Sequence, residues 1–307
     1  MNIALSNLIM PEDIMYYASA KDFCTFKVGG PLEYLICPKT LDSFCNYLQS
    51  LDANNIKYKV VGNMSNILPS DNLNSGVYIT TRYINEKPKV FNTCVTAYCG
   101  YPLSALCYKT AQLGLAGIEN LFGIPATVGG AVYNNAGAFG QSISNTLKSL
   151  LIYSKGKTTS VSASYANLAY RHSAFQTNGE IVLSATFKLT PQNAQVVLNN
   201  LKKVQSLRTE TQPNLPSAGS VFKRVENTSA GLLIQQVGLK GKQIGNAQIS
   251  TKHANFIVNL GGATSADIKT LVTLAHKQVK QKLNINLSRE IEYIGDPNED
   301  CSRLSYT

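Results

Sequence analysis

The sequence predicts an α+β protein with two or three domains. Strand-like and helix-like segments alternate along the chain. The 307 residues exceed the expected size of one domain, about 150 residues. Pro213 and Pro216 mark a junction between two domains, because closely spaced prolines interrupt regular structure.

The N-terminal third contains one clear helix and several short strands. Apolar side chains at helical spacing over residues 41–51 follow a candidate N-cap, Thr40. Pro102 begins a second helix that ends near Leu113, with Gly114 as its stop signal. Three strands are expected, at residues 59–61, 77–80 and 90–97.

Residues 114–140 (GLAGIENLFGIPATVGGAVYNNAGAFG) contain seven glycines. So many glycines do not suit the interior of a helix or a strand. The interleaved apolar residues also exclude a low-complexity linker. The segment therefore predicts backbone that packs closely against something flat or charged.

The second half of the chain alternates in the same way. Strands are expected over residues 149–153 and 181–189, and a helix over residues 191–207. The best-signalled helix begins at Thr264, which forms a capping-box pattern with Asp267. Its apolar side chains share one face, and lysines lie toward its C-terminal end, where cations suit the helix dipole.

The net charge of +10 narrows the class of ligand. Residues 1–100 hold eight basic and eight acidic residues, so the excess lies in the rest of the chain. It fits an anionic small ligand, a nucleic acid or a solvated face. No basic run with interleaved aromatic residues occurs, which disfavours nucleic acid.

Cysteine and histidine usage predicts a cytoplasmic protein without a metal site. The seven cysteines are odd in number and form no C-x-x-C, which indicates reduced thiols. The three histidines show no ligand spacing. No apolar stretch has the length of a membrane span, and the N-terminus lacks the basic region of a signal peptide.

Two glycine-rich segments are candidates for a phosphate-containing ligand. Residues 59–68 (KVVGNMSNIL) take a strand into a tight loop that can direct backbone N–H groups at a phosphate. This loop matches neither a Rossmann nor a Walker motif, and the alternative is an ordinary β-turn. Residues 123–130 (GIPATVGG) and 134–140 (NNAGAFG) suit a planar ring and a pyrophosphate, or form a structural loop.

Three further residues are candidates for chemistry. Arg171 follows an aromatic residue, and a fixed guanidinium binds a carboxylate bidentately. Ser220 lies in an accessible turn, PSAGSVFK, that is not a G-x-S-x-G elbow, because Phe222 occupies the last position. Glu290 is isolated among strand-like residues. Taken singly, a surface arginine and a surface carboxylate remain the alternatives.

Together these segments resemble the UDP-N-acetylenolpyruvoylglucosamine reductase family over residues 20–295, in its shorter branch without an extra substrate-covering insertion. The resemblance depends on the order of the motifs, since each is weak alone. The motifs are TFKVGG (25–30), the Gly62 loop, GIE (117–119), the two segments from Gly123 and Asn134, YRHS (170–173), GSVFK (219–223), GLKG (238–241), STKHANFIVN (250–259) and Glu290.

The resemblance implies an FAD-binding fold of the vanillyl-alcohol-oxidase/PCMH type with two α+β subdomains, at residues 1–80 and 81–210. A C-terminal α+β domain at residues 211–295 is expected to bind the substrate. The segment 285–307 is a candidate to return to the first subdomain, and residues 296–307 are expected to be a tail.

The resemblance also implies a reaction. NADPH reduces non-covalently bound FAD, which reduces UDP-N-acetylglucosamine enolpyruvate to UDP-N-acetylmuramate for peptidoglycan synthesis. A monomer without nucleic-acid or membrane partners is expected. Ser220 matches the proton donor, and Arg171 and Glu290 match the pair that stabilises the enol intermediate.

Further residues carry over by position. Those for the cofactor are Val61, Gly62, Asn63, Met64, Ser65, Asn66, Ile118, Gly123, Ile124, Pro125, Thr127, Gly129, Gly130, Asn135, Ala136 and Gly137. Those for the substrate are Phe139, Lys223, Arg224, His253 and Asn255.

The sequence departs from the family pattern at several positions. Met64 and Ala126 each replace a usual glycine, and Phe139 stands where tyrosine is common. If position 64 needs a positive φ, methionine is strained there. The alternatives are another oxidase of the same fold, a silent flavin or nucleotide-sugar binder, and a basic nucleic-acid-binding protein.

Overall fold

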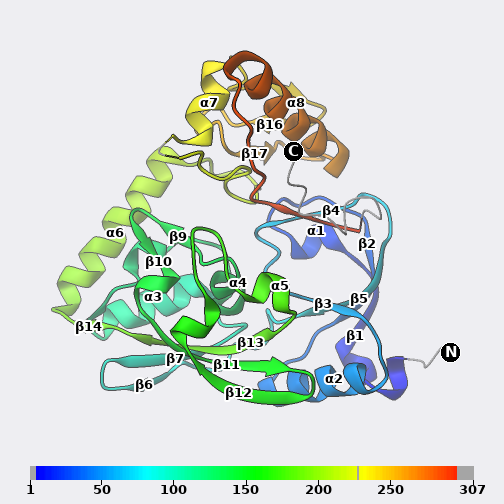
Figure 1. The fold of residues 1–307 in the computed structure, drawn as a ribbon, viewed down its shortest axis with the longest axis vertical. Helices are drawn as coiled ribbons and strands as arrows, with labels where there is room; N and C mark the ends of the chain where they lie inside the picture. The colour runs from blue at the N-terminus through cyan, green and yellow to red at the C-terminus, as the bar shows by residue number, and fades with distance from the viewer. Residues whose placement is uncertain (1–4, 227, 296–307) are drawn as a thin grey trace. The chain divides into compact units, whose positions relative to one another are not determined.

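The computed structural model describes residues 5–226 and 228–295 (Figure 1). Contacts divide the chain into two compact units. The first unit comprises the residues up to Tyr16, Tyr34–Asn63 and Gly76–Arg208. The second comprises Tyr17–Glu33, Met64–Ser75 and the chain from Thr209 onward. The predicted tail, residues 296–307, lies outside the described residues, and the three-domain division remains a prediction.

A five-stranded antiparallel sheet dominates the first unit, in the order β12-β11-β13-β7-β6. Helix α4 (Val128–Tyr133) packs on β13 and β7 (Figure 1). The apolar core on this sheet includes Phe187 and Leu150. The strands are β6 (Lys89–Phe91), β7 (Cys94–Tyr98), β11 (Leu147–Ser154), β12 (Lys157–Ser162) and β13 (Ile181–Lys188).

The single strand expected over residues 90–97 is wrong, because β6 and β7 form a hairpin. Asn92 turns the chain with a φ of +51°, a left-handed conformation that asparagine tolerates. The expected helix at Pro102 is confirmed as α3 (Leu103–Gln112). Gly114 follows it with a φ of +67°.

A four-stranded sheet has the order β1-β2-β5-β3, and its strands β3 and β5 run parallel. Helix α2 (Leu41–Ala53) confirms the predicted N-cap, because Thr40 Oγ1 accepts from Ser43 N at 3.1 Å. The strands are β1 (Ile14–Ser19), β2 (Pro31–Ile36), β3 (Tyr58–Val61) and β5 (Asn74–Thr80).

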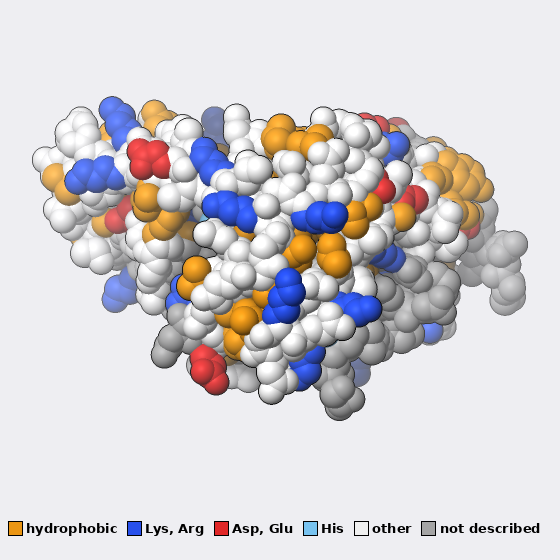
Figure 2. All heavy atoms as spheres, turned by 90° about the horizontal axis from the view of Figure 1, so that it is seen from above, with side chains coloured by type: hydrophobic (Ala, Val, Ile, Leu, Met, Phe, Trp, Pro, Cys, Tyr) orange, Lys and Arg blue, Asp and Glu red, His pale blue; other side chains and the backbone are white. Residues whose placement is uncertain are grey.

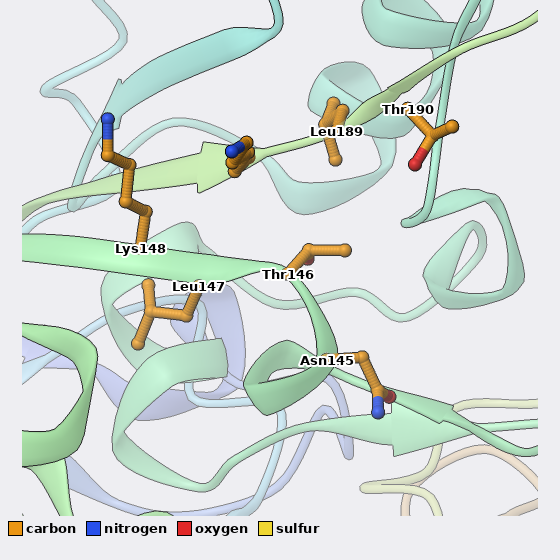
Figure 3. A pocket seen from close by; sticks show the side chains of 7 residues that line it. Asn145, Thr146, Leu147, Lys148, Leu189 and Thr190 are labelled. Carbon is orange, nitrogen blue, oxygen red and sulfur yellow. The ribbon is translucent and has the colours of Figure 1, made fainter.

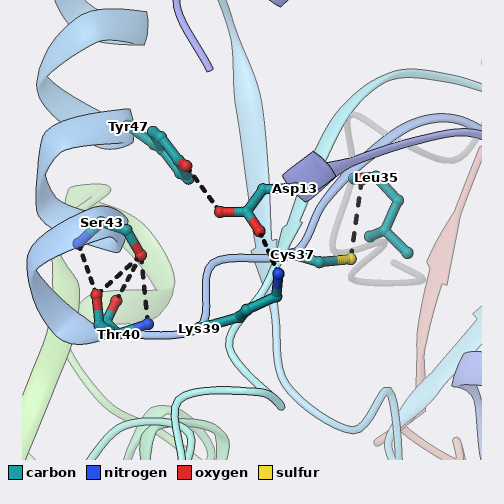
Figure 4. A network of polar contacts seen from close by, with 7 residues as sticks. All are labelled: Asp13, Leu35, Cys37, Lys39, Thr40, Ser43 and Tyr47. Carbon is teal, nitrogen blue, oxygen red and sulfur yellow. Dashed lines mark hydrogen bonds and ion pairs between the residues drawn. The ribbon is translucent and has the colours of Figure 1, made fainter. Parts of the chain in front are cut away.

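A buried carboxylate ties α2 to the start of β1 (Figure 4). Asp13 accepts a hydrogen bond from Tyr47 Oη at 2.7 Å and forms an ion pair with Lys39 Nζ at 3.3 Å. Burial and the bond to Asp13 raise the pKa of Tyr47 from 10 to about 12. The protonated phenol is therefore the form that stabilises the folded chain.

Replacing Tyr47 by phenylalanine is expected to lower the free energy of unfolding by about 1–3 kcal/mol, because a buried acceptor loses its donor. The Tyr47 contribution is fully present below pH 10 and is lost as the pH rises toward 12. Urea unfolding of both proteins at pH 8 and at pH 11 should therefore show a smaller difference at pH 11. An equal difference at both pH values would contradict this assignment.

The second unit holds the antiparallel sheet β15-β16-β17 with α7 and α8 beside it (Figure 1). Helix α8 (Ser265–Leu283) confirms the predicted capping box of Thr264 and Asp267. The carboxylate of Asp71 accepts from Ser265 N at 2.8 Å and Ala266 N at 2.9 Å, at the positive end of the α8 dipole. The other elements are α7 (Ala230–Gln236), β15 (Gln243–Ile244), β16 (Ala247–Ile249) and β17 (Ile257–Asn259).

Two short strands join distant parts of the second unit. β18 (Glu292–Ile294) pairs in parallel with β4 (Ile67–Pro69). The other short strands and α-helices of the described residues are α1 (Ala20–Phe23), β8 (Leu115–Ala116), β9 (Gly137–Ala138), β10 (Gln141–Ser142), α5 (Phe175–Asn178) and β14 (Thr190–Pro191). The helix expected over residues 191–207 begins and ends later, as α6 (Ala194–Thr211), because Pro191 lies in β14.

Figure 2 shows Lys and Arg side chains at several places on one face. No helix within the described residues is both long enough and apolar enough to cross a membrane.

Candidate active site

The two glycine-rich segments of the first unit meet. Gly62 directly follows strand β3, and a Cβ atom at this position would lie 2.4 Å from Thr127 Oγ1. Asn63 Nδ2 donates to the carbonyl of Pro125 at 3.2 Å. Only glycine permits so close an approach at position 62. The structure thus brings together segments that lie some sixty residues apart in the sequence.

Thr127 shapes the second of these segments. Its Oγ1 accepts a hydrogen bond from Gly130 N, and Thr127 is thereby the N-cap of α4. Gly129 N donates to Cys99 O at 2.7 Å, and a Cβ at Gly129 would lie 2.9 Å from Cys99 Cβ. Backbone and small side chains therefore form these loops, a composition that fits the close approach of a planar ring and a pyrophosphate.

Met64 has a φ of +46°, so the predicted strain at this position is confirmed. Its side chain is only 2% exposed. A left-handed non-glycine residue costs about 1–2 kcal/mol, whereas burying a methionine instead of alanine contributes about 2–5 kcal/mol. Burial therefore outweighs strain, and methionine replaces glycine here without a net loss of stability.

The balance at Met64 predicts an order of stability. Met64→Gly removes both the strain and the buried side chain, and should lower the free energy of unfolding by about 1–3 kcal/mol. Met64→Ala keeps the strain and should be less stable than Met64→Gly by about 1 kcal/mol. Urea unfolding measures both variants. A glycine variant more stable than the wild type would show that strain dominates.

A two-residue turn holds Arg171. Ala169 and His172 exchange N–H···O=C bonds of 3.1 Å across it, and Arg171 has a φ of +52°. Arg171 Nη2 donates to Gly137 O at 2.9 Å. The guanidinium also lies 5.3 Å from the ring centroid of Tyr170. The arginine is therefore held at its backbone and at its charged end.

Buried polar side chains fix this turn from outside. Asn135 Nδ2 donates to Ala169 O at 2.7 Å, and its Oδ1 accepts from Ser144 N at 3.1 Å. Ser173 Oγ donates to Tyr133 O at 2.6 Å. Asn135 is only 5% exposed, so its amide is used within the protein. Ala136 and Gly137 follow it and reach β9.

Arg208 contacts two of the glycine-rich segments and was not predicted from the sequence. Its guanidinium donates from Nε to Phe122 O at 2.6 Å and lies 5.0 Å from the ring centroid of Phe139. A Cβ at Gly123 would lie 2.7 Å from Arg208 Cδ. Burial lowers the pKa of this guanidinium. No sequence motif marks Arg208, because the hydrogen bond to Phe122 O is made to a backbone carbonyl. Ile118 lies in the core beneath, 1% exposed.

In the second unit, Ser220 and Glu290 lie on paired segments. Ser220 forms an antiparallel bridge with Phe256. The next residue, Val221, accepts a hydrogen bond from Glu290 N at 2.8 Å. Two of the three predicted catalytic residues, seventy positions apart, are therefore brought together by backbone hydrogen bonds.

Asn66 and Lys223 add to this arrangement. Asn66 Nδ2 donates to Glu290 O at 3.1 Å, and its carbonyl accepts from Glu292 N at 2.9 Å. Lys223 N donates to Ser288 O at 2.8 Å. Asn66 therefore holds the backbone of Glu290 directly.

His253 and Asn255 occupy the opposite side of the Ser220 segment. His253 Nδ1 accepts from Asn255 N at 3.3 Å, and its ring lies edge-to-face on Phe256 with centroids 5.0 Å apart. Burial lowers the pKa of His253 and favours the neutral ring. Arg224, which is predicted to bind the substrate, is exposed.

A cavity of about 380 Å³ lies elsewhere, between the start of β11 and the end of β13 (Figure 3). None of the predicted site residues lines it.

Comparisons with known proteins now give the family. Residues 32–162 match the FAD binding domain, and residues 212–294 match the C-terminal domain of UDP-N-acetylenolpyruvoylglucosamine reductase. The reductase of Lactobacillus acidophilus is 40% identical over 89% of this chain and 92% of its own. The chain belongs to the UDP-N-acetylenolpyruvoylglucosamine reductase family. The Clostridium botulinum (strain 657) member is 40% identical over 95% of this chain and 96% of its own.

A solved structure agrees with this family. The reductase from Thermus caldophilus superposes with a TM-score of 0.77 at 32% identity, covering 92% of this chain and 98% of its own. The α+β FAD-binding fold, the FAD cofactor and the assignment as a flavin-dependent oxidoreductase are thereby confirmed. The roles of individual site residues remain predictions.

Proposed function

We propose that the chain reduces UDP-N-acetylglucosamine enolpyruvate to UDP-N-acetylmuramate with NADPH, in peptidoglycan precursor synthesis. The observation that carries this proposal beyond family membership is the pairing of the Ser220 and Glu290 segments through the 2.8 Å bond from Glu290 N to Val221 O. This bond joins the backbone of the segment that carries the proposed proton donor to the backbone of the residue that carries the proposed carboxyl group, and a general acid with a second polar group suits the protonation of an enol.

Bound FAD supplies the redox chemistry, taking electrons from NADPH and delivering them to the enolpyruvyl double bond. We assign its binding to the contacting loops that carry Gly62 and Thr127, continuing through Asn135. Those loops fit it because their glycines allow backbone N–H groups to approach the pyrophosphate.

Arg171 offsets the negative charge that develops beside the substrate carboxylate. Its fixed guanidinium needs little reorganisation, because Gly137 O and the ring of Tyr170 already hold it. Ser220 gives the proton that completes reduction. We assign to Glu290, by family resemblance, the stabilisation of the same intermediate.

We also propose a substrate-binding role for residues that carry over by family resemblance. Lys223 and Arg224 suit the diphosphate of a nucleotide sugar. Phe139 and His253 offer ring surfaces for the remainder. The proposal also places a monomer in the cytoplasm, without nucleic-acid or membrane partners.

A spectroscopic titration tests the proposed function. The purified protein should show a flavin absorbance that bleaches with NADPH without oxygen and returns only when UDP-N-acetylglucosamine enolpyruvate is added. Return only with oxygen would indicate an oxidase, and a flavin that never bleaches would indicate a silent binder. A protein that takes up no FAD would overturn the proposal.

A further inference from the structure

We propose that Asn255 is a positioning residue that aligns the proton donor Ser220 with Glu290, and that it does not contact the substrate. This inference rests on the proposed function and replaces the role that resemblance assigned to Asn255. Asn255 holds the backbone of the segment that carries Ser220, and the same segment is bonded to Glu290 N.

The first observation is how the Ser220 segment pairs with the segment of Asn255. Ser220 pairs with Phe256, and Val221 N donates to Asn255 O at 2.8 Å. One residue further, the N–H and C=O of Phe222 meet the Asn255 side chain. Oδ1 accepts from Phe222 N at 3.0 Å, and Nδ2 donates to Phe222 O at 2.8 Å. The side-chain amide thus acts as an extra peptide group and extends the backbone pairing.

The second observation is burial. Asn255 is 6% exposed and Phe222 is 3% exposed. Buried amide groups need partners, and one orientation of the Asn255 amide satisfies the donor and the acceptor of Phe222 together. Both polar atoms of the side chain are therefore used by the backbone of the catalytic segment.

The third observation is the other edge of the same segment. Val221 O accepts from Glu290 N, and Lys223 N donates to Ser288 O at 2.8 Å. The Ser220 segment thus lies between two other segments, that of Asn255 on one side and that of Glu290 on the other. Loosening the middle segment on the Asn255 side shifts Ser220 relative to Glu290.

The experiment separates the two half-reactions in Asn255→Ala and Asn255→Asp. Flavin reduction by NADPH should stay within about twofold of the wild type. Reoxidation by the enolpyruvyl substrate should slow about 10²-fold, the effect of a reacting group misplaced by about 1 Å. The solvent isotope effect on reoxidation should rise, because protonation becomes limiting. Asn255→Asp keeps an oxygen that accepts the hydrogen bond from Phe222 N, so this variant replaces Asn255→Ala in the experiment if the alanine variant does not fold.

Asn259→Ala is the matched control. Asn259 is also a buried asparagine, 4% exposed, with its amide on backbone groups, but those belong to Phe26, Lys27, Gly261 and Ala263. Its variant should lower the melting temperature at least as much as Asn255→Ala. It should leave the solvent isotope effect and the reoxidation rate within about threefold of the wild type.

A double variant decides between positioning and substrate contact. If Asn255 acts through Ser220, Ser220→Ala/Asn255→Ala should reoxidise no more slowly than Ser220→Ala alone. Additive losses, or weaker substrate binding in a titration of the oxidised flavin spectrum, would overturn the inference in favour of substrate contact. Wild-type flavin that the substrate does not reoxidise would instead reject the proposed function.

Discussion

Replacing Ser220 by alanine is expected to slow flavin reoxidation by the enolpyruvyl substrate about 10²–10⁴-fold, the usual contribution of a positioned general acid. Flavin reduction by NADPH should be unchanged, because it needs no proton from Ser220. The segment should keep its fold, since the bridge to Phe256 and the bond from Glu290 N to Val221 O are made by backbone atoms.

Ser217→Ala provides the control for this variant. Ser217 lies three residues earlier on the same segment and is likewise partly buried. Stopped-flow absorbance should give wild-type rates for both half-reactions of Ser217→Ala. A Ser220→Ala protein that reoxidises at more than about a third of the wild-type rate would show that another group, or water, supplies the proton.

Local patterns explain which elements were predictable. Thr40 and Thr264 begin helices because each side chain bonds a backbone N–H within three residues, and such signals are complete in a short window of sequence. The turn at Asn92 was missed because the flanking residues favour strand on both sides. Asparagine was the available signal, since it is one of the few residues that adopt a positive φ easily.

Long-range contacts explain what was not predictable. Asp71 caps α8 from nearly two hundred residues away, and Asn259 binds Phe26 O across a similar separation. These bonds place residues 17–33 and 64–75 in the second unit. A carboxylate or an amide in sequence does not reveal which distant backbone group it will meet.

The candidate site follows the same distinction. Ordered motifs pointed to Ser220 and Glu290, and the structure brings their segments together. The side chains that hold these segments in place were not predicted as such. Arg208 was not predicted at all, and Asn135 was predicted to bind the cofactor. Each binds backbone carbonyls, which every sequence contains at every position, so no pattern of side chains could identify the pairing.

Substitutions of Arg171 test the charge-stabilising role. Arg171→Met should slow reoxidation about 10²–10³-fold, the loss expected when one donor to a developing negative charge is removed. Arg171→Lys should fall between methionine and the wild type, because a lysine keeps the charge but lacks the planar fork for a carboxylate. Both substitutions keep a non-glycine residue at φ +52°, so they change the backbone strain little.

Lys188→Met controls for loss of a positive charge from the first unit, because Lys188 is exposed and lies at the end of β13. Its reoxidation rate should remain within about twofold of the wild type.

The deciding comparison is between the reoxidation rates of the two Arg171 variants as ionic strength rises. An effect of the local charge should keep the lysine variant faster than the methionine variant at high salt, since position 171 is partly buried and partly buried charges are screened less than exposed ones. Equal rates for the two variants would mean that Arg171 acts by geometry alone, through its bond to Gly137 O.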